Sequence, residues 1–128
     1  MKKVIFILAM LFSMQAIAQE SADITRKEYL GVLTLTEKYK DDKNWGNVEQ
    51  DIIGEHFQRL AHLKQEGIVI MAGRTQLKSN DPALMGLVIF YAKDDKEAMQ
   101  IMMEDPAVKG KIMLAKIHPY GIAIGKCD

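Results

Sequence analysis

Residues 47–75 read NVEQDIIGEHFQRLAHLKQEGIVIMAGRT, and this stretch decides the fold. Apolar side chains recur at helical spacing as far as Gly67, at Val48, Ile52, Ile53, Phe57, Leu60 and Leu63. Asn47 is a residue type that caps helices, and Gln50 three positions later completes a capping-box-like pair. After Gly67 the pattern changes, because residues 68–75 form a nearly continuous run of apolar, β-forming residues. The stretch therefore predicts a long amphipathic helix followed by a buried strand.

The flanking segments predict three more strands and a second helix. Residues 29–36, 86–92 and 111–118 are short and rich in β-forming residues, whereas residues 38–47 are charged and predict a loop. A second helix begins at Asp94 or Asp95 and ends by Asp105, because Pro106 disfavours helical geometry in the residue before it. The order βαββαβ predicts an α+β, ferredoxin-like domain, an antiparallel four-stranded sheet with both helices on one face. The other face would stay apolar, so we expect a homodimer packed sheet to sheet.

The N-terminus has the features of a secretory signal peptide. Two lysines precede an apolar run over residues 4–14, and Ala16 and Ala18 supply the small residues of a cleavage site. As a helix this run rises about 16 Å, whereas a spanning helix must cross roughly 30 Å. We therefore expect residues 1–18 to be removed, residues 19–27 to be a flexible lead-in and residues 28–126 to form one periplasmic or secreted domain, with no stable membrane anchor.

The charge balance and the cysteine content narrow the possible functions. The chain has 17 basic and 17 acidic residues, and the predicted signal peptide contains two of the lysines, so the mature chain keeps 15 basic residues. A slight acidic excess is atypical of a nucleic-acid-binding protein. Cys127 is the only cysteine of the chain, so no internal disulfide can form. It is expected to be a free thiol, with a crosslink between two chains as the alternative.

Two polar residues fall on the inward faces of the predicted helices. With 100° per residue, His56 lies in the middle of the apolar stripe of the first helix, and Arg59 lies at its edge. Asp105 falls on the inward stripe of the second helix. An imidazole oriented by a carboxylate is suited to general acid–base chemistry. The alternatives are a core histidine bonded to a backbone carbonyl and an aspartate that only terminates its helix.

The order and spacing of several short motifs resemble the YciI-like (YCII-related) domain family. These motifs are GEHFQRL at residues 54–60, Leu63, Gly67, Ala72-Gly73, Glu97-Ala98 and DPAV at residues 105–108. The resemblance covers residues 29–124 and implies a ferredoxin-like, dimeric α/β-barrel arrangement whose active site is a histidine and an aspartate, here His56 and Asp105. Its relatives include a dehydrochlorinase of chlorinated hydroxyquinols. Arg74 stands where many members have proline, and Ala107 where many have an aromatic residue, which predicts a reshaped pocket.

Three further residues are expected to bind substrate. Arg74 at a strand end is suited to an anionic group, Arg59 lies beside the dyad, and His118 at the end of the fourth strand is expected to face the same cleft. The alternative for Arg74 and His118 is a solvated surface position. We expect no metal and no cofactor, because His56 and His62 lie on different helix faces and Met99, Met102 and Met103 are more typical of core packing than of a copper site.

The sequence thus predicts an exported enzyme in which His56, oriented by Asp105, moves a proton on a small aromatic or lactone-like molecule. Elimination, isomerisation and hydrolysis all fit this chemistry, and the residues do not identify the substrate. One alternative is a non-catalytic domain that binds a small ligand with the same dyad. The other is a structural dimer subunit of a larger exported assembly.

Overall fold

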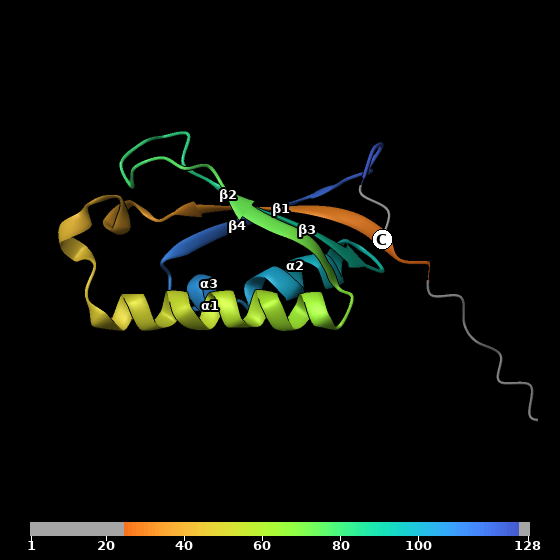
Figure 1. Cartoon of the computed structure of the whole chain (residues 1–128), viewed down its shortest axis with the longest axis horizontal. Helices are drawn as coiled ribbons and strands as arrows, with labels where there is room; N and C mark the ends of the chain where they lie inside the picture. Colours follow the sequence, from red (N-terminus) through yellow and green to blue (C-terminus); the bar gives the residue numbers. More distant parts are fainter. Residues whose placement is uncertain (1–24, 126–128) are drawn as a thin grey trace, which may run out of the picture.

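The computed structural model describes residues 25–125, so the predicted signal peptide, most of the predicted lead-in and Cys127 lie outside the described residues. Four strands form one antiparallel sheet, and the helices cover one of its faces (Figure 1). The elements are β1 (Lys27–Leu35), α1 (Asn47–Gln65), β2 (Val69–Arg74), β3 (Gly86–Ala92), α2 (Asp95–Met103), α3 (Pro106–Lys109) and β4 (Met113–Pro119). The ferredoxin-like α+β fold is confirmed. No helix within residues 25–125 is both long and apolar enough to cross a membrane.

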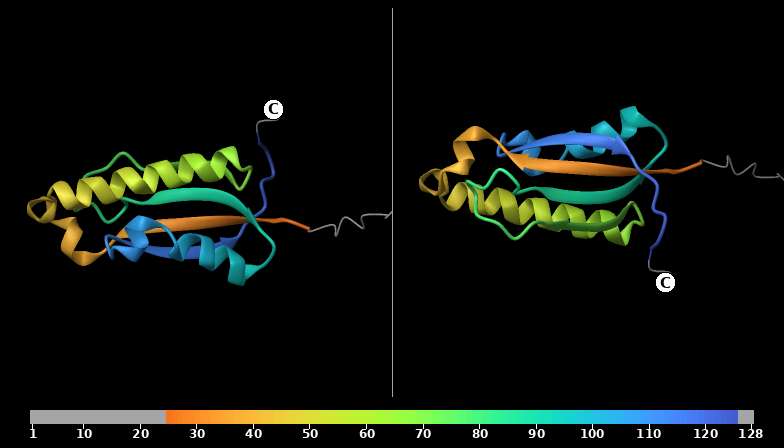
Figure 2. Two further views of the ribbon diagram at one scale, coloured as in Figure 1. Left: turned by 90° about the horizontal axis from the view of Figure 1, so that it is seen from below. Right: turned by 90° about the horizontal axis from the view of Figure 1, so that it is seen from above.

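The strand order β2-β3-β1-β4 interleaves the two βαβ units. The connection through α1 joins β1 to β2 with β3 between them, and the connection through α2 joins β3 to β4 with β1 between them. Both helices therefore return across the same face, where they lie beside each other (Figure 2). On this face the strands contribute buried side chains, which include Tyr29, Leu33, Val88 and Phe90. The alternating residues, such as the opposed pair Leu30 and Ile89, point to the other face of the sheet.

The N-terminus of α1 differs from the prediction. Asn47 is the first helical residue rather than the cap, and Gly46 precedes the helix with extended backbone. The side chain of Glu49, not Gln50, accepts a hydrogen bond of 3.0 Å from the backbone N–H of Gly46. At the other end Gly67 has φ +74°, a left-handed conformation that glycine adopts without steric cost. This turn sends the chain directly into β2.

Two short segments depart from the predicted loops. Residues 36–46 contain two turns of 3₁₀-helix, η1 (Glu37–Lys40) and η2 (Asp42–Asn44), where a loop was predicted. The helix before Pro106 ends at Met103, in agreement with the effect of the proline, but Pro106 then begins α3, a short helix that the sequence pattern does not predict. Proline is favoured at the first position of a helix because the N–H that it lacks has no partner there. The face thus holds a third, short helix beside α1 and α2 (Figure 1).

Candidate active site

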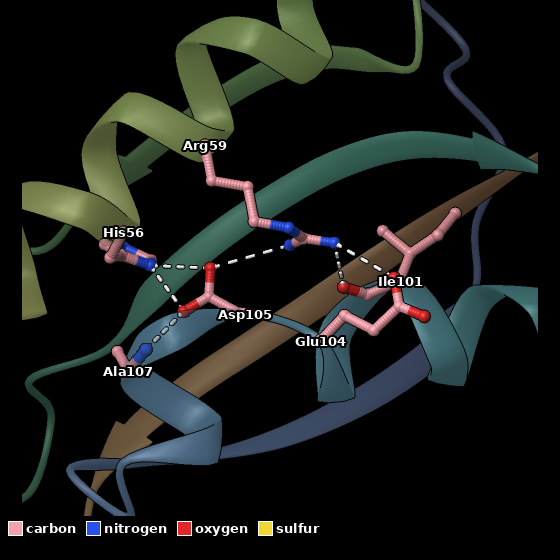
Figure 3. Close-up of polar contacts among 6 residues, drawn as sticks. All are labelled: His56, Arg59, Ile101, Glu104, Asp105 and Ala107. Atoms are coloured by element: carbon pink, nitrogen blue, oxygen red, sulfur yellow. Dashed lines mark hydrogen bonds and ion pairs between the residues drawn. The ribbon is translucent and has the colours of Figure 1, made fainter.

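His56 and Asp105 lie in direct contact between the helical layer and the sheet. Only 4% of His56 and 1% of Asp105 are exposed. The Nδ1 atom of His56 is 2.8 Å from each carboxylate oxygen of Asp105, so the two side chains are hydrogen-bonded and join α1 to the start of α3 (Figure 3). The alternative of a core histidine bonded to a backbone carbonyl is wrong in this structure. A carboxylate holds the ring instead.

Asp105 is oriented by its place immediately before α3. As the N-cap residue of this helix it accepts a hydrogen bond of 2.8 Å from the backbone N–H of Ala107 through Oδ1. A carboxylate at a helix N-terminus also benefits from the partial positive charge of the helix dipole. The Asp-Pro-Ala sequence therefore does two things at once. It starts α3, and it fixes the carboxylate that faces His56.

Arg59 supports the pair from the side of α1. Its Nη2 donates a hydrogen bond of 2.8 Å to the backbone carbonyl of Ile101, and its Nη1 lies 3.8 Å from Oδ2 of Asp105 (Figure 3). Arg59 does not belong to the residues that line the cavity beside His56. The guanidinium instead contacts the end of α2 and the charge of Asp105, so a role of Arg59 in binding substrate stays a prediction.

A large cavity adjoins the dyad. Its volume is about 990 Å³, and it lies at the end of the sheet where β1 ends and β3 begins. One stripe of α1 forms a wall, with Gln50, Ile53, Phe57, Leu60 and Lys64 recurring every three or four positions. Phe57 belongs to the apolar pattern of this helix, yet it is 59% exposed. The apolar residues of α1 thus divide into two groups. Leu63 is buried in the core, whereas Phe57 lines the cavity.

The second ring nitrogen of His56 faces this cavity. Nε2 makes no hydrogen bond within residues 25–125, but no buried side-chain nitrogen or oxygen in this range lacks a partner. Nε2 is therefore not sealed in the core, and since His56 lines the cavity, a molecule in the cavity can reach this atom. One nitrogen held by a carboxylate and the other open to a cavity is an arrangement that can take up and return a proton.

The remaining predicted residues divide between the cavity and the opposite face. Arg74 lines the cavity from the end of β2. His118 pairs with Leu30 across β1 and β4 and so lies on the face that points away from the helices, outside the cavity. His118 does not line this cavity, contrary to expectation, because it lies opposite Leu30 near the other end of β4, whereas the cavity reaches β4 at Met113. Within residues 25–125, no three His, Cys, Asp or Glu side chains are grouped as metal ligands.

Two residues at the cavity are not among the predicted substrate-binding residues, although the sequence gives Trp45 two alternatives, a place at the mouth of the pocket or at the edge of a dimer. Lys64 adds a positive charge from α1, and its spacing of seven residues from Phe57 is the signal that could have placed it there. Trp45 lines the cavity from the segment before α1, and its Nε1 donates a hydrogen bond of 2.8 Å to the backbone carbonyl of Tyr39. No periodicity in that segment indicates this position. The fold of the 3₁₀ turns determines it.

Comparisons with known proteins give a family and a distant structural likeness. No curated protein matches the chain. A solved structure with a similar chain is that of 5-chloro-2-hydroxyhydroquinone dehydrochlorinase from Burkholderia phenoliruptrix AC1100, in complex with 2,5-dihydroxybenzoquinone. The two share 15% sequence identity over 73% of this chain and 93% of the other, with a TM-score of 0.48. The model of the YCII-related domain matches residues 32–119. The chain therefore belongs to the YCII-related domain family.

Proposed function

We propose that this protein is a small-molecule enzyme, a lyase, isomerase or hydrolase, in which His56 moves a proton. The observation that carries the proposal is the position of His56, with Nδ1 held at 2.8 Å by Asp105 and with the ring forming part of a cavity of about 990 Å³. Imidazoles whose ring is oriented by a carboxylate are common groups for general acid–base steps near neutral pH.

The dyad would work through Nε2. In the neutral ring Nδ1–H donates to the Asp105 carboxylate, so the lone pair of Nε2 is directed to the cavity. Nε2 takes a proton from a C–H or O–H group of the substrate or, for hydrolysis, from a water molecule, and the electron pair of the broken bond stays with the carbon or oxygen that lost the proton. That pair expels a leaving group, shifts a double bond or attacks a carbonyl carbon. The imidazolium then returns the proton to the product or to the leaving group, while Asp105 balances its positive charge.

A direct test compares four proteins on a panel of elimination, isomerisation and hydrolysis substrates. The wild type is expected to convert at least one compound, and His56→Gln and Asp105→Asn are expected to lower the rate by about 10²-fold or more, the usual contribution of a general acid–base group. His62→Gln is the matched control, because His62 lies on the same helix and is paired at the surface with Glu66. Turnover that survives His56→Gln would show that the dyad is not the catalytic group.

A non-catalytic binding domain is the second candidate. It is favoured by the structural role of Asp105, which caps α3 through the N–H of Ala107 and joins this helix to α1 through His56. The two candidates differ in one measurement. A binding domain would retain a ligand in the cavity without converting it, and His56→Gln would then change the affinity for that ligand but no rate.

We also propose that two copies pair through the sheet face that points away from the helices. That face carries apolar side chains, and its members Met71, Leu87 and Leu114 are 59%, 37% and 58% exposed. Exposed apolar patches of this kind often mark an interface. Sedimentation analysis is expected to give a dimer, and Leu30→Lys at the centre of the face is expected to give a monomer. A wild-type monomer at micromolar concentration would contradict this proposal.

Export is proposed from the sequence of residues 1–18. The expected result for protein recovered from the periplasm or the culture medium is a mature chain that begins at Gln19. N-terminal mass spectrometry measures this directly. An intact segment from Met1 to Ala18 on the exported protein would contradict the predicted cleavage.

A further inference from the structure

The cavity beside His56 has an unbalanced positive charge. Lys64 and Arg74 both line it, and neither forms an ion pair or side-chain hydrogen bond with another residue in the 25–125 range. Asp42 is the one acidic residue among the lining residues. The charge of buried Asp105 does not alter this balance, because Arg59 lies 3.8 Å from it. With His56 neutral, the lining residues carry one positive charge that a bound monoanion would neutralise.

Arg74 is the better suited of the two cations for holding that anion. A guanidinium donates two parallel hydrogen bonds to a carboxylate, whereas a lysine ammonium acts as a single strongly hydrated charge. Arg74 stands at the end of the edge strand β2, immediately after Ala72 and Gly73, which also line the cavity. Ala72, two positions before Arg74, lies on the same side of β2 and presents only a methyl group there. A carboxylate bound there would be partly shielded from water by the cavity wall, which strengthens the charge-assisted bonds.

Aliphatic side chains, three methionines and the rings of Trp45 and Phe57 supply the apolar part of the wall. The indole of Trp45 has its N–H occupied by the carbonyl of Tyr39, so the ring offers the cavity apolar surface without an unpaired donor. The rings of Phe57 and His56 lie 5.2 Å apart at an angle of 63°, and both line the cavity. Met113 is partly buried on the floor. Aromatic rings and methionine sulfur make favourable contacts with a further aromatic ring.

We infer that the cavity binds an aromatic monocarboxylate, with its carboxylate on Arg74 and its ring against Phe57 and Trp45. This inference rests on the proposed function, because it takes the His56 cavity as the substrate site and names the class of substrate. The volume of about 990 Å³ lies at the upper end of the roughly 300–1,000 Å³ found for small-molecule sites, so a ligand with one or two fused rings fits.

Calorimetric titration of the protein with four probes tests the inference. The probes are naphthoate, its neutral isostere naphthamide, naphthalene dicarboxylate and decanoate, all at low ionic strength because salt screens partly exposed charges. Naphthoate is expected to bind about tenfold more tightly than naphthamide, the usual effect of one charge-assisted pair. It is also expected to bind more tightly than the dianion and the aliphatic acid. Three results would overturn the inference. They are equal affinity for naphthoate and naphthamide, stronger binding of the dianion or the aliphatic acid than of naphthoate, and no binding of naphthoate at millimolar concentration.

The affinities of arginine variants for naphthoate test whether its carboxylate binds to Arg74. Arg74→Gln is expected to weaken naphthoate binding about tenfold and to leave naphthamide unchanged, and Arg74→Lys should give an intermediate loss because the charge remains and the fork is lost. Arg26→Gln is the matched control, because Arg26 is an exposed arginine whose Nη1 bonds to the carbonyl of Gly67, outside the cavity lining. Full naphthoate affinity in Arg74→Gln would overturn the assignment. Arg74 is exposed, so its replacement should leave the fold intact.

Failure of this inference is distinguishable from failure of the proposed function. If aromatic acids bind through Arg74 but none is converted, the ligand class stands and the acid–base function fails. If neutral compounds are converted with a requirement for His56, and Arg74→Gln leaves their rate unchanged, the acid–base function stands and the ligand class fails.

Discussion

The Nδ1 atom of His56 lies 2.8 Å from both carboxylate oxygens of Asp105, so a single nitrogen makes all of the hydrogen bonds between the two residues. This geometry determines where the ring proton resides. In the neutral imidazole, Nδ1 must carry the proton because a carboxylate can only accept. The reactive lone pair is therefore on Nε2, the nitrogen next to the cavity.

The tautomer of His56 can be measured. Nitrogen-15 NMR at alkaline pH is expected to show the proton on Nδ1 of His56. His62 provides the internal comparison, because its Nε2 pairs with Glu66 at 3.0 Å and its side chain is 67% exposed. His62 should show averaged signals, or a proton on Nε2. A proton on Nε2 of His56 in the neutral ring would contradict the structure of the dyad.

Removal of the carboxylate should lower stability strongly. In Asp105→Ala the Nδ1 of His56 and the backbone N–H of Ala107 both lose their acceptor in a buried place. The free energy of unfolding is expected to fall by about 3–5 kcal/mol, as for other buried pairs with one partner removed. Asp105→Asn should cost less, because its amide oxygen can still accept one of the two hydrogen bonds. Urea unfolding followed by circular dichroism measures both changes.

A comparison with Asp94 distinguishes the two roles of Asp105, which caps a helix and also binds His56. Asp94 caps α2 and accepts a hydrogen bond of 2.8 Å from the backbone N–H of Glu97, but it is exposed and faces no histidine. Asp94→Ala should therefore cost about 1 kcal/mol, the usual value for loss of a cap. Equal losses for Asp94→Ala and Asp105→Ala would mean that the contact with His56 adds nothing to stability.

Arg59 is expected to matter more through Ile101 than through Glu104. Its hydrogen bond to the Ile101 carbonyl is 2.8 Å long, whereas the Glu104 carboxylate lies 3.9 Å away and is 57% exposed. Arg59→Met should lower the free energy of unfolding by about 1–3 kcal/mol, because it leaves the carbonyl of Ile101 and the charge of Asp105 with less compensation. Glu104→Gln should change it by less than about 1 kcal/mol. The reverse order in urea unfolding would show that the surface ion pair is the stronger contact.

Gly31 leaves space for a methionine in the core. A Cβ atom at this position would lie 2.7 Å from Cε of Met102, whose side chain packs on the centre of β1. Gly31→Ala is expected to lower the free energy of unfolding by about 1–3 kcal/mol, because the thioether must move within a filled core. Gly86→Ala is the control from another strand, since its Cβ would meet Leu33 at an ordinary 3.5 Å. Thermal unfolding of the two variants gives the comparison.

The buried tyrosine of β1 predicts a loss of stability at high pH. The hydroxyl of Tyr29 donates a hydrogen bond of 2.7 Å to Asp95, and this bond, together with burial and the nearby negative charges, raises the pKa of Tyr29 from 10.0 to about 12. Because the folded-state pKa is the higher one, the contribution to stability is complete below pH 10 and is lost as the pH rises through 12.

The variant Tyr29→Phe isolates this effect. Other groups titrate equally in both proteins, so the wild type should lose more stability than Tyr29→Phe between pH 10 and pH 12. Urea unfolding at several pH values in this range gives the difference. Parallel curves for the two proteins would contradict the raised pKa of Tyr29.

Local patterns determined the four strands, the two longer helices and the inward direction of His56. The second helix ends at Met103, before Asp105, so the cap of α3 orients this carboxylate instead. The change from helical to strand periodicity at Gly67, the apolar run of β3 and the break before Pro106 are properties of neighbouring residues, so they can be found without the rest of the chain. The same holds for His56, because a helical wheel turns it to the buried side whatever lies opposite. The sequence predicted the ferredoxin-like order for this reason.

Only the tertiary structure decided which residues share a cavity. Phe57 and Leu63 belong to one apolar pattern but lie about 120° apart around the helix, at 100° per residue. Only the packing of α1 against the sheet decided that the side with Phe57 borders the cavity, whereas Leu63 is buried. Arg59 was expected to bind substrate, but its guanidinium donates a hydrogen bond to the carbonyl of Ile101 near the end of α2. His118 lies outside the cavity because it is far along β4 from Met113, which lines the cavity. Helical and strand periods state on which side of its own element a residue lies, but the distance to another element depends on packing between segments far apart in the chain.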